Sequence, residues 1–420
     1  MSLTQESALV TLAGDRRAFR RLPELKGAPA TFRAALRIIA RNWMLGSVTF
    51  VMPSGRELRI VGADQPGLTA GRLIVRDFRF MRRVLATGDI GFAEGYMAGE
   101  WDTPDLTALL LVFAANWERL RRVTQGNPLA WTVNRIRHAL RGNTREGARK
   151  NIHAHYDLGN SFYERWLDPT MTYSSARYDR PGQPLCEAQT AKYRALAQGM
   201  GLQAGQSVLE IGCGWGGFAE FAAREVGAKV TAITISEEQF KFARERMFKQ
   251  GLAERADIRF IDYRDVEGRF DRVASIEMFE AVGERYWPAY FGKIHEALAP
   301  AGRAGLQIIT IRDEDFEEYR GRADFIQKYI FPGGMLPSEA RLKAVTDKIG
   351  LTWTGLTRFA QHYGDTLAEW HRNFDAAWSD IAPLGFDERF RKLWKFYLGY
   401  CEAGFRTERT NVVQLSLAKA

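Results

Sequence analysis

The sequence has few cysteines and histidines and no long apolar run, and each shortage excludes a class of protein. Three cysteines among 420 residues, Cys186, Cys213 and Cys401, are too few and too scattered for a disulfide framework or a zinc site. His153 and His155 lack further obvious ligands, so we expect no metal. No window reaches the ~18 to 20 apolar residues of a membrane-spanning helix. The first residues lack the charged and then apolar order of a signal peptide, which favours a cytoplasmic protein.

The charge balance favours an anionic partner. Lys and Arg number 59 against 50 Asp and Glu, which gives a net charge of +9 at pH 7. Such a protein can bind nucleic acid or an anionic membrane surface. The familiar nucleic-acid-binding motifs do not occur, so we expect no nucleic acid and favour peripheral binding at the inner face of the cell membrane. A basic composition without a partner is the alternative.

The sequence pattern divides the chain into three parts. Residues 1–125 are interpreted as a smaller α+β amino-terminal domain associated with lipid or membrane, and residues 153–420 as the catalytic domain. Residues 126–152 form a basic amphipathic linker between them. The linker either lies on acidic lipid headgroups or is a solvated connector.

Local patterns predict the elements of the amino-terminal part. Two apolar runs, 46–52 and 56–62, flank a Pro-Ser-Gly turn signal and predict a hairpin. Residues 73–85 predict a strand that leads into a helix, and the small residues within 88–101 indicate tight packing between elements. Apolar positions at helical spacing predict one helix over 105–120.

A glycine-rich turn follows a short apolar strand. Residues 208–218 read V-L-E-I-G-C-G-W-G-G-F, which predicts a strand, a turn and the start of a helix. The glycines also satisfy the spacing of a dinucleotide site, which remains the alternative. Glu210, however, would repel a pyrophosphate and attract the amino group of a methionine moiety. The pattern resembles motif I of class I S-adenosylmethionine-dependent methyltransferases, and it consists of Glu210, Gly212, Gly214 and Gly216.

Strands and helices alternate from residue 208 onward. This alternation predicts an α/β domain with a mostly parallel sheet and helices on both faces. The resemblance of the glycine turn implies that this is the Rossmann-like fold of class I methyltransferases. Ligands in such folds bind beyond the carboxyl ends of the strands. The expected strands are 208–211, 229–235, 257–261, 270–276 and 304–311.

Two further segments at strand ends are candidates for cofactor binding. Thr234 and Ser236 close the second strand and Gln239 follows on the next helix, where the hydroxyls of a bound nucleoside are expected. Ser236 and Gln239 also fit a helix capping box, and both roles can hold together. Tyr263 and Arg264 follow the third strand and are placed to meet an adenine, with a plain surface turn as the alternative.

Motifs beyond the glycine turn resemble the cyclopropane-fatty-acyl-phospholipid synthase family, which includes the mycolic acid cyclopropane synthases. The resemblance covers nearly the whole chain, and the segments that carry it are 95–105, 153–163, 171–176, 234–239, 275–280 and 329–338. In that family the double bond of an acyl chain attacks the sulfonium methyl group and leaves a carbocation on the chain. A base then removes a proton from the added methyl, and a ring closes. The resemblance implies S-adenosyl-L-methionine as cofactor and an unsaturated phospholipid as substrate.

The site residues of the family carry over at matching positions. Tyr173 and Ser174 match residues near the sulfonium, whereas Glu280 and Tyr363 match the glutamate and tyrosine of the family's bicarbonate site. The resemblance therefore implies cofactor-binding roles for the first pair and catalytic roles for the second.

Two positions depart from the cyclopropane synthases. Ser175 stands where they carry Cys, and Gln307 stands where they carry His. Both side chains can donate a hydrogen bond to an oxyanion, but a Gln cannot supply the positive charge of an imidazolium. Whether bicarbonate is a cofactor is therefore left open.

The same departure leaves the product open. Without a base beside the added methyl, the cation can lose a proton from the chain instead and become a methyl-branched acyl group with a shifted double bond. Ring formation and branching are both retained as hypotheses. Glu280 is the residue expected to govern the proton in either case, and a buried carboxylate that only ties down loops is the alternative.

Other interpretations change the acceptor or remove catalysis. The enzyme could act on another lipid or an amine, or the chain could be a non-catalytic lipid-binding protein. Aromatic residues after Phe316 suit an acyl channel, although most are expected to be plain core. The sequence does not reveal double-bond position, headgroup preference or whether a homodimer forms.

Overall fold

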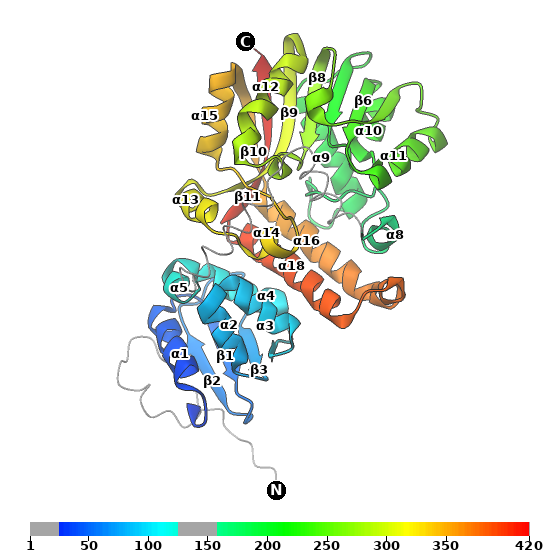
Figure 1. Ribbon diagram of the computed structural model, residues 1–420. Coiled ribbons are helices and arrows are strands. Elements are labelled where there is room, and N and C mark those ends of the chain that lie inside the picture. Colours follow the sequence, from blue (N-terminus) through cyan, green and yellow to red (C-terminus); the bar gives the residue numbers. More distant parts are fainter. Residues whose placement is uncertain (1–24, 125–157, 420) are drawn as a thin grey trace. The chain divides into compact units, whose positions relative to one another are not determined.

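The computed structural model describes residues 25–124 and 158–419, and its contacts divide the chain into two compact units (Figure 1). The amino-terminal unit contains the described residues up to 124 together with residues 385–407. The other unit, here called the catalytic unit after its expected role, contains the described residues from 158 to 384 and from 408 to 419. This grouping differs from the expected boundaries, since residues 385–407 belong with the amino-terminal elements. The expected linker, 126–152, lies outside the described residues.

The amino-terminal unit has a four-stranded mixed sheet in the order β2-β1-β3-β4. Its strands are β1 (Ser47–Val51), β2 (Glu57–Val61), β3 (Gly71–Val75) and β4 (Trp101–Asp102). β1 and β2 pair antiparallel, which confirms the predicted hairpin, and β1 pairs parallel with β3. The expected strand leading into a helix is also confirmed, because β3 is followed by α2.

Glycines allow the helices of this unit to pack closely against one another. These helices are α1 (Ala30–Asn42), α2 (Arg79–Thr87), α3 (Asp89–Met97), α4 (Leu106–Ala115), α5 (Trp117–Thr124) and α18 (Glu388–Arg406). A Cβ on Gly95 of α3 would lie 2.8 Å from Phe80 Cβ of α2, which bears out the tight packing expected there. A Cβ on Gly399 of α18 would lie 3.3 Å from Leu110 Cδ1 of α4.

The single helix predicted over 105–120 is wrong, because α4 and α5 are separated at Asn116. The Asn116 side chain is buried and bonds to backbone groups distant in sequence. Its Oδ1 accepts hydrogen bonds from the amides of Met44 and Leu45 at 2.8 and 3.0 Å, and its Nδ2 donates to Leu45 O at 2.9 Å. Asparagine side chains that bond to backbone groups compete with helix continuation, which the apolar spacing does not reveal.

The catalytic unit is built on a seven-stranded sheet in the order β10-β11-β9-β8-β5-β6-β7. β9, β8, β5, β6 and β7 pair parallel, and β11 alone runs antiparallel to its neighbours β9 and β10. The strands are β5 (Ser207–Ile211), β6 (Lys229–Thr234), β7 (Ala256–Phe260), β8 (Phe270–Ile276), β9 (Leu298–Ile311), β10 (Leu351–Arg358) and β11 (Thr410–Lys419). The expected α/β fold with a mostly parallel sheet is confirmed.

Helices cover both faces of this sheet (Figure 1). One face packs against α12 and α15 through a core that includes Leu209, Val273 and Phe291. The other packs against α9, α10 and α11 through a core that includes Val208, Phe218 and Ala243. The helices are α8 (Asn160–Tyr163), α9 (Leu185–Gly199), α10 (Gly217–Phe221), α11 (Glu237–Lys249), α12 (Trp287–Ala297), α13 (Asp313–Gly321), α14 (Phe325–Tyr329), α15 (Glu339–Ile349), α16 (Ala360–Ala376) and α17 (Trp378–Ile381).

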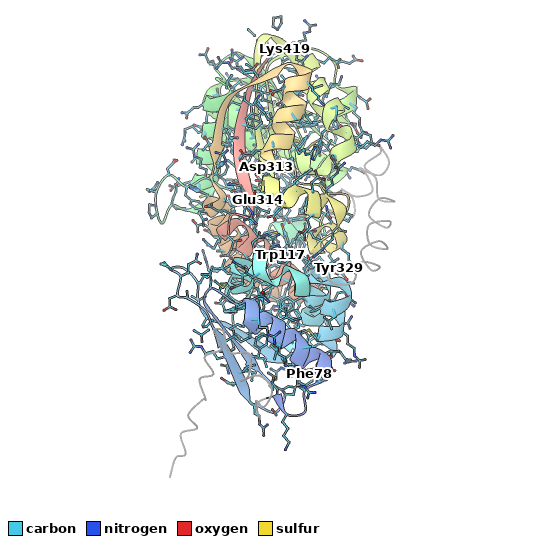
Figure 2. The ribbon with its side chains drawn as sticks, turned by 90° about the vertical axis from the view of Figure 1, so that its left-hand side faces the viewer. Phe78, Trp117, Asp313, Glu314, Tyr329 and Lys419 are labelled. Carbon is cyan, nitrogen blue, oxygen red and sulfur yellow. The ribbon has the colours of Figure 1, made fainter. Side chains whose placement is uncertain are left out.

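The carboxyl edge of the parallel strands is the edge where ligands bind in such sheets. Asp313 and Glu314, which follow β9, mark this edge in Figure 2. Lys419, the last residue of β11, marks the opposite edge of the sheet, because β11 runs antiparallel to β9. The sequence analysis did not predict β10 or β11. Within residues 25–124 and 158–419, no helix is both long and apolar enough to cross a membrane.

Candidate active site

The glycine-rich turn after β5 leaves room for a ligand. Gly212, Gly214 and Gly216 have φ values of 81°, 54° and 84°, a region that side chains disfavour. A Cβ on Gly212 would lie 2.7 Å from Met278 Cγ, so the turn packs against the segment that follows β8. A Cβ on Gly214 would meet nothing within 4 Å, so the backbone there borders open space. These features fit a cofactor that approaches bare backbone.

Glu210, the residue before the last of β5, offers a free acceptor atom. The residue is buried, and its Oε2 has no hydrogen-bond partner among the described residues. Burial raises the pKa of Glu210 well above its ordinary value, whereas the charges of Arg246 and Lys192 act in the opposite direction. A buried acceptor without a partner is costly, so a ligand donor such as an amino group fits this position. The site therefore suits the expected cofactor, and the assignment remains a prediction.

The segment after β6 combines a helix cap with a side-chain contact. Ser236 caps α11 by accepting a hydrogen bond from the Gln239 amide at 3.4 Å. The Gln239 side chain does not complete a capping box but accepts from Thr234 Oγ1 at 2.9 Å. Thr234 Oγ1 also accepts from the Ser236 amide at 3.1 Å. All three side chains lie together at the carboxyl end of β6, where the nucleoside is expected.

The segment after β7 forms a short 3₁₀ turn. Asp262 accepts a hydrogen bond from the Arg264 amide at 3.0 Å and two more from the Arg264 guanidinium, both at 2.8 Å. Tyr263 is buried and lies edge-on to Tyr290. The Asp262 carboxylate is thus largely engaged within the turn. Tyr263 and Arg264 stay predicted adenine contacts, and their geometry equally fits a structural turn.

Three of the four predicted catalytic residues meet at one carboxylate that the sequence analysis did not single out, Glu277. Its Oε1 accepts from the Ser175 amide at 2.9 Å and from Gln307 Nε2 at 2.8 Å. Its Oε2 accepts from the Tyr363 hydroxyl at 2.7 Å. These donors come from the loop before α9, from β9 and from α16. They form a hydrogen-bond cluster, here called the Glu277 cluster, with Glu277, Ser175, Gln307 and Tyr363 as members.

The backbone of Glu277 is strained. Its φ is 47°, in the left-handed region, although it is not a glycine. This conformation costs roughly 1 to 2 kcal/mol for a residue with a side chain. The Glu277 amide donates to Gln307 O at 2.8 Å, which ties the turn to the neighbouring strand. Strain of this kind persists only where surrounding contacts hold it, and it is common at functional sites.

A buried lysine lies near this cluster. Lys192 of α9 is fully buried and donates to Ser174 Oγ at 2.7 Å. Burial lowers the pKa of Lys192 to about 7, while the charges of Glu277, Asp168 and Glu210 oppose that shift. Its charge therefore acts both on the cofactor end of the site and on the Glu277 cluster.

The two carboxyl groups after β8 differ in environment. Burial raises the pKa of Glu277, and Lys192, Tyr363, Gln307 and the Ser175 amide act against the increase. Burial, and next the charge of Glu277, raise the pKa of Glu280 to about 8. Glu280 Oε1 accepts from the Ile309 amide at 2.5 Å, and its buried Oε2 has no partner among the described residues. At neutral pH the structure thus favours a protonated Glu280, whereas at Glu277 four neighbouring groups oppose the effect of burial.

Aromatic rings border the cluster. Tyr173 lies 5.3 Å from Trp370 and 5.4 Å from Tyr163 between ring centroids, and Trp166 lies 5.8 Å from Trp370. Tyr363 meets Trp370 edge-on at 6.2 Å, so it contacts both these rings and Glu277. Aromatic faces attract cations, which suits a site where a sulfonium or carbocation is handled.

Glu277 and Lys192 are the residues that the sequence analysis missed. The sequence contains a feature that could have identified each of them. Glu277 directly follows an expected strand of the parallel sheet, at the ligand-binding end. Lys192 is a charged residue among the small and apolar residues on the buried side of α9, where Ala188, Ala191 and Leu196 also lie. Among the residues described, no group of three or more metal-ligating side chains occurs, and His153 and His155 lie outside them.

Comparisons with known proteins identify one family of enzymes. Residues 143–415 match the family described as mycolic acid cyclopropane synthetase. The chain is 36% identical over 427 residues to tuberculostearic acid methyltransferase from Mycobacterium tuberculosis, an alignment that covers 99% of this chain and 98% of that protein. It is 34% identical over 350 residues to cyclopropane-fatty-acyl-phospholipid synthase from Escherichia coli, covering 82% of this chain and 87% of that protein.

A solved structure supports the same grouping. A mycolic acid cyclopropane synthase complexed with SAH and CTAB matches with a TM-score of 0.61 and 29% identity. The match covers 64% of this chain and 98% of that chain.

Proposed function

The chain belongs to the mycolic acid cyclopropane synthetase family, whose members are S-adenosylmethionine-dependent methyltransferases of fatty acids and lipids, and we propose that it methylates the double bond of an unsaturated phospholipid acyl chain. The product we propose is a methyl-branched chain that keeps a double bond. The observation that carries this proposal is a carboxyl group, Glu277, which accepts three hydrogen bonds beside aromatic rings and close to the glycine turn.

The residues present fit the cofactor. Glu210 and the glycines Gly212, Gly214 and Gly216 would hold its methionine end, and Thr234 and Gln239 would contact its ribose. When bound there, S-adenosyl-L-methionine supplies an electrophilic methyl group, which an alkene takes up to leave a cation on the acyl chain. The chain's own residues must then exclude water, tolerate that cation and accept a proton. The buried aromatic rings around Trp370 serve the first two needs.

Branching is favoured over ring closure by similarity. The relative that aligns with 99% of this chain is named a tuberculostearic acid methyltransferase, whereas the cyclopropane synthase from Escherichia coli aligns with 82%. Ser175 and Gln307 also depart from the cyclopropane synthase pattern at the positions that hold its proton acceptor. Ring formation is the second candidate, since Glu277 would equally be available to a proton of the added methyl.

Mass spectrometry of acyl chains tests the proposal. The purified protein is incubated with monounsaturated phospholipid vesicles and S-adenosylmethionine that carries a fully deuterated methyl. We expect all three deuteriums in the product, because the proton leaves from the chain. Retention of two would mean that the added methyl lost a proton and would favour a ring or a methylene branch, which hydrogenation separates. Absence of label from every lipid would refute the phospholipid substrate.

The place of action follows from charge and substrate. A net charge of +9 and a phospholipid acceptor support peripheral binding at the cytoplasmic face of an anionic membrane. The amino-terminal unit and the basic linker are the parts proposed to approach it. On this proposal, the expected domain division separates a lipid-associated part from the catalytic part.

A further inference from the structure

The donors that would hold an external oxyanion are already engaged by a side chain of the protein. By resemblance, a bicarbonate would be held at four positions, which are Ser175, Gln307, Tyr363 and Glu280. The Ser175 amide, Gln307 Nε2 and the Tyr363 hydroxyl all donate to Glu277 instead. A second anion placed there would lose these donors to a carboxylate already in place and would be repelled by its charge. Bicarbonate therefore does not fit this arrangement.

The surroundings also keep Glu277 fit for proton transfer. Burial raises the pKa of Glu277, while three donors and the nearby charge of Lys192 act against the increase and favour the ionised form, which is the form that accepts a proton. Its Oε2 has one recorded donor, Tyr363, so a lone pair remains. The side chain is half-buried rather than fully enclosed, which leaves it accessible to a group in the site.

We infer that Glu277 is a built-in general base that replaces bicarbonate, so that this enzyme is independent of bicarbonate. The inference rests on the proposed methylation of an acyl double bond. In this step a C–H bond of the chain carbon next to the cationic carbon breaks. Its electron pair forms the new C=C bond, and the proton passes to the Glu277 carboxylate. The charge balances, because one cation and one carboxylate become a neutral alkene and a carboxylic acid, which later releases its proton to water.

The strained backbone makes a sharp test available. Glycine adopts a φ of 47° without strain, so Glu277→Gly should fold and leave a space lined by the same three donors. A small carboxylate such as formate, or bicarbonate itself, then fits where the side chain was. Glu277→Gln keeps the shape of the side chain but cannot take the proton.

Turnover of deuterated methyl into vesicle lipid is measured for the wild type, both variants and Glu254→Gln, an exposed control. We expect wild-type turnover to be unchanged in carbonate-free buffer and E277Q to be slower by at least ~100-fold, a usual contribution of a general base. We expect E277G to be similarly slow and to recover at least tenfold with millimolar formate or bicarbonate. Cofactor affinity by calorimetry should stay within about threefold in every variant.

Separate outcomes identify which idea fails. A wild type that needs added bicarbonate, or an E277Q that turns over like the wild type, overturns the inference while the proposed function stands. An E277G that binds cofactor and stays inactive with both anions also counts against a base at this position. A wild type that labels no lipid refutes the proposed function itself.

Discussion

Lys192 shows how one buried charge can link the two halves of the site. It is fully buried on α9 and acts electrostatically on Glu277, Asp168 and Glu210. Its pKa of about 7 means that it is charged mainly below neutral pH. We interpret it as a positioning residue whose charge opposes the increase that burial causes in the pKa of Glu277.

Replacement of Lys192 should therefore change the pH dependence of methyl transfer. Without the cation, the pKa of Glu277 rises further, because the charge that opposes its burial is gone. We expect Lys192→Met to slow methyl transfer at least tenfold at pH 6 and much less at pH 9, where the wild-type lysine is itself neutral. The ratio of wild-type to variant rate is measured across this range.

Gln189→Met is the matched control for that prediction. Gln189 lies on the same helix, is fully buried and donates to Ser174 O at 3.0 Å, but carries no charge. Its replacement perturbs packing near Ser174 and should lower the rate by a similar factor at every pH. If the Lys192→Met ratio is also independent of pH, the role of Lys192 is structural only.

Between elements, Asn116 joins the α4–α5 break to the segment before β1. Its side chain makes four hydrogen bonds. The Oδ1 atom accepts from the amides of Met44 and Leu45, and Nδ2 donates to the carbonyls of Leu45 and Val112. Removing these hydrogen bonds leaves backbone groups without partners in a partly buried place. A buried polar group without a partner costs about 1 to 3 kcal/mol.

We expect Asn116→Ala to lower the free energy of unfolding of the amino-terminal unit by about 3 kcal/mol. Denaturant unfolding followed by tryptophan fluorescence measures it. Asn42→Ala is the control, since the Asn42 side chain makes one recorded hydrogen bond, to Ile38 O within its own helix. A loss no greater than that of the control would show that the junction does not depend on Asn116.

Some elements were predictable because their signals are local. The alternation of strands and helices, the hairpin before residue 62 and the Ser236 cap all depend on neighbours within a few residues. The Asn116 break, in contrast, depends on partners 71 and 72 residues away. α18 behaves similarly, since its aromatic residues read as part of the catalytic domain but belong to the amino-terminal unit.

For the whole molecule, the net charge of +9 predicts electrostatic binding to membranes. We expect the full-length protein to sediment with vesicles that contain anionic lipid and to be released as salt is raised, because surface charges are screened beyond a Debye length of about 8 to 10 Å. Sedimentation with neutral vesicles at several salt concentrations is the control. Equal binding to neutral vesicles at high salt would contradict an electrostatic membrane surface.

The sequence by itself determined the fold of the catalytic unit, the glycine turn and the family, since each depends on short motifs read in order. Only the tertiary structure decided which carboxylate gathers the catalytic donors. The sequence analysis favoured Glu280, but Ser175, Tyr363 and Gln307 donate to Glu277 from 102, 86 and 30 residues away. The two glutamates are three positions apart and chemically identical. The left-handed backbone at Glu277 and the pairing of β8 with β9 direct Glu277 toward these donors and Glu280 toward the Ile309 amide. No local sequence pattern encodes that difference.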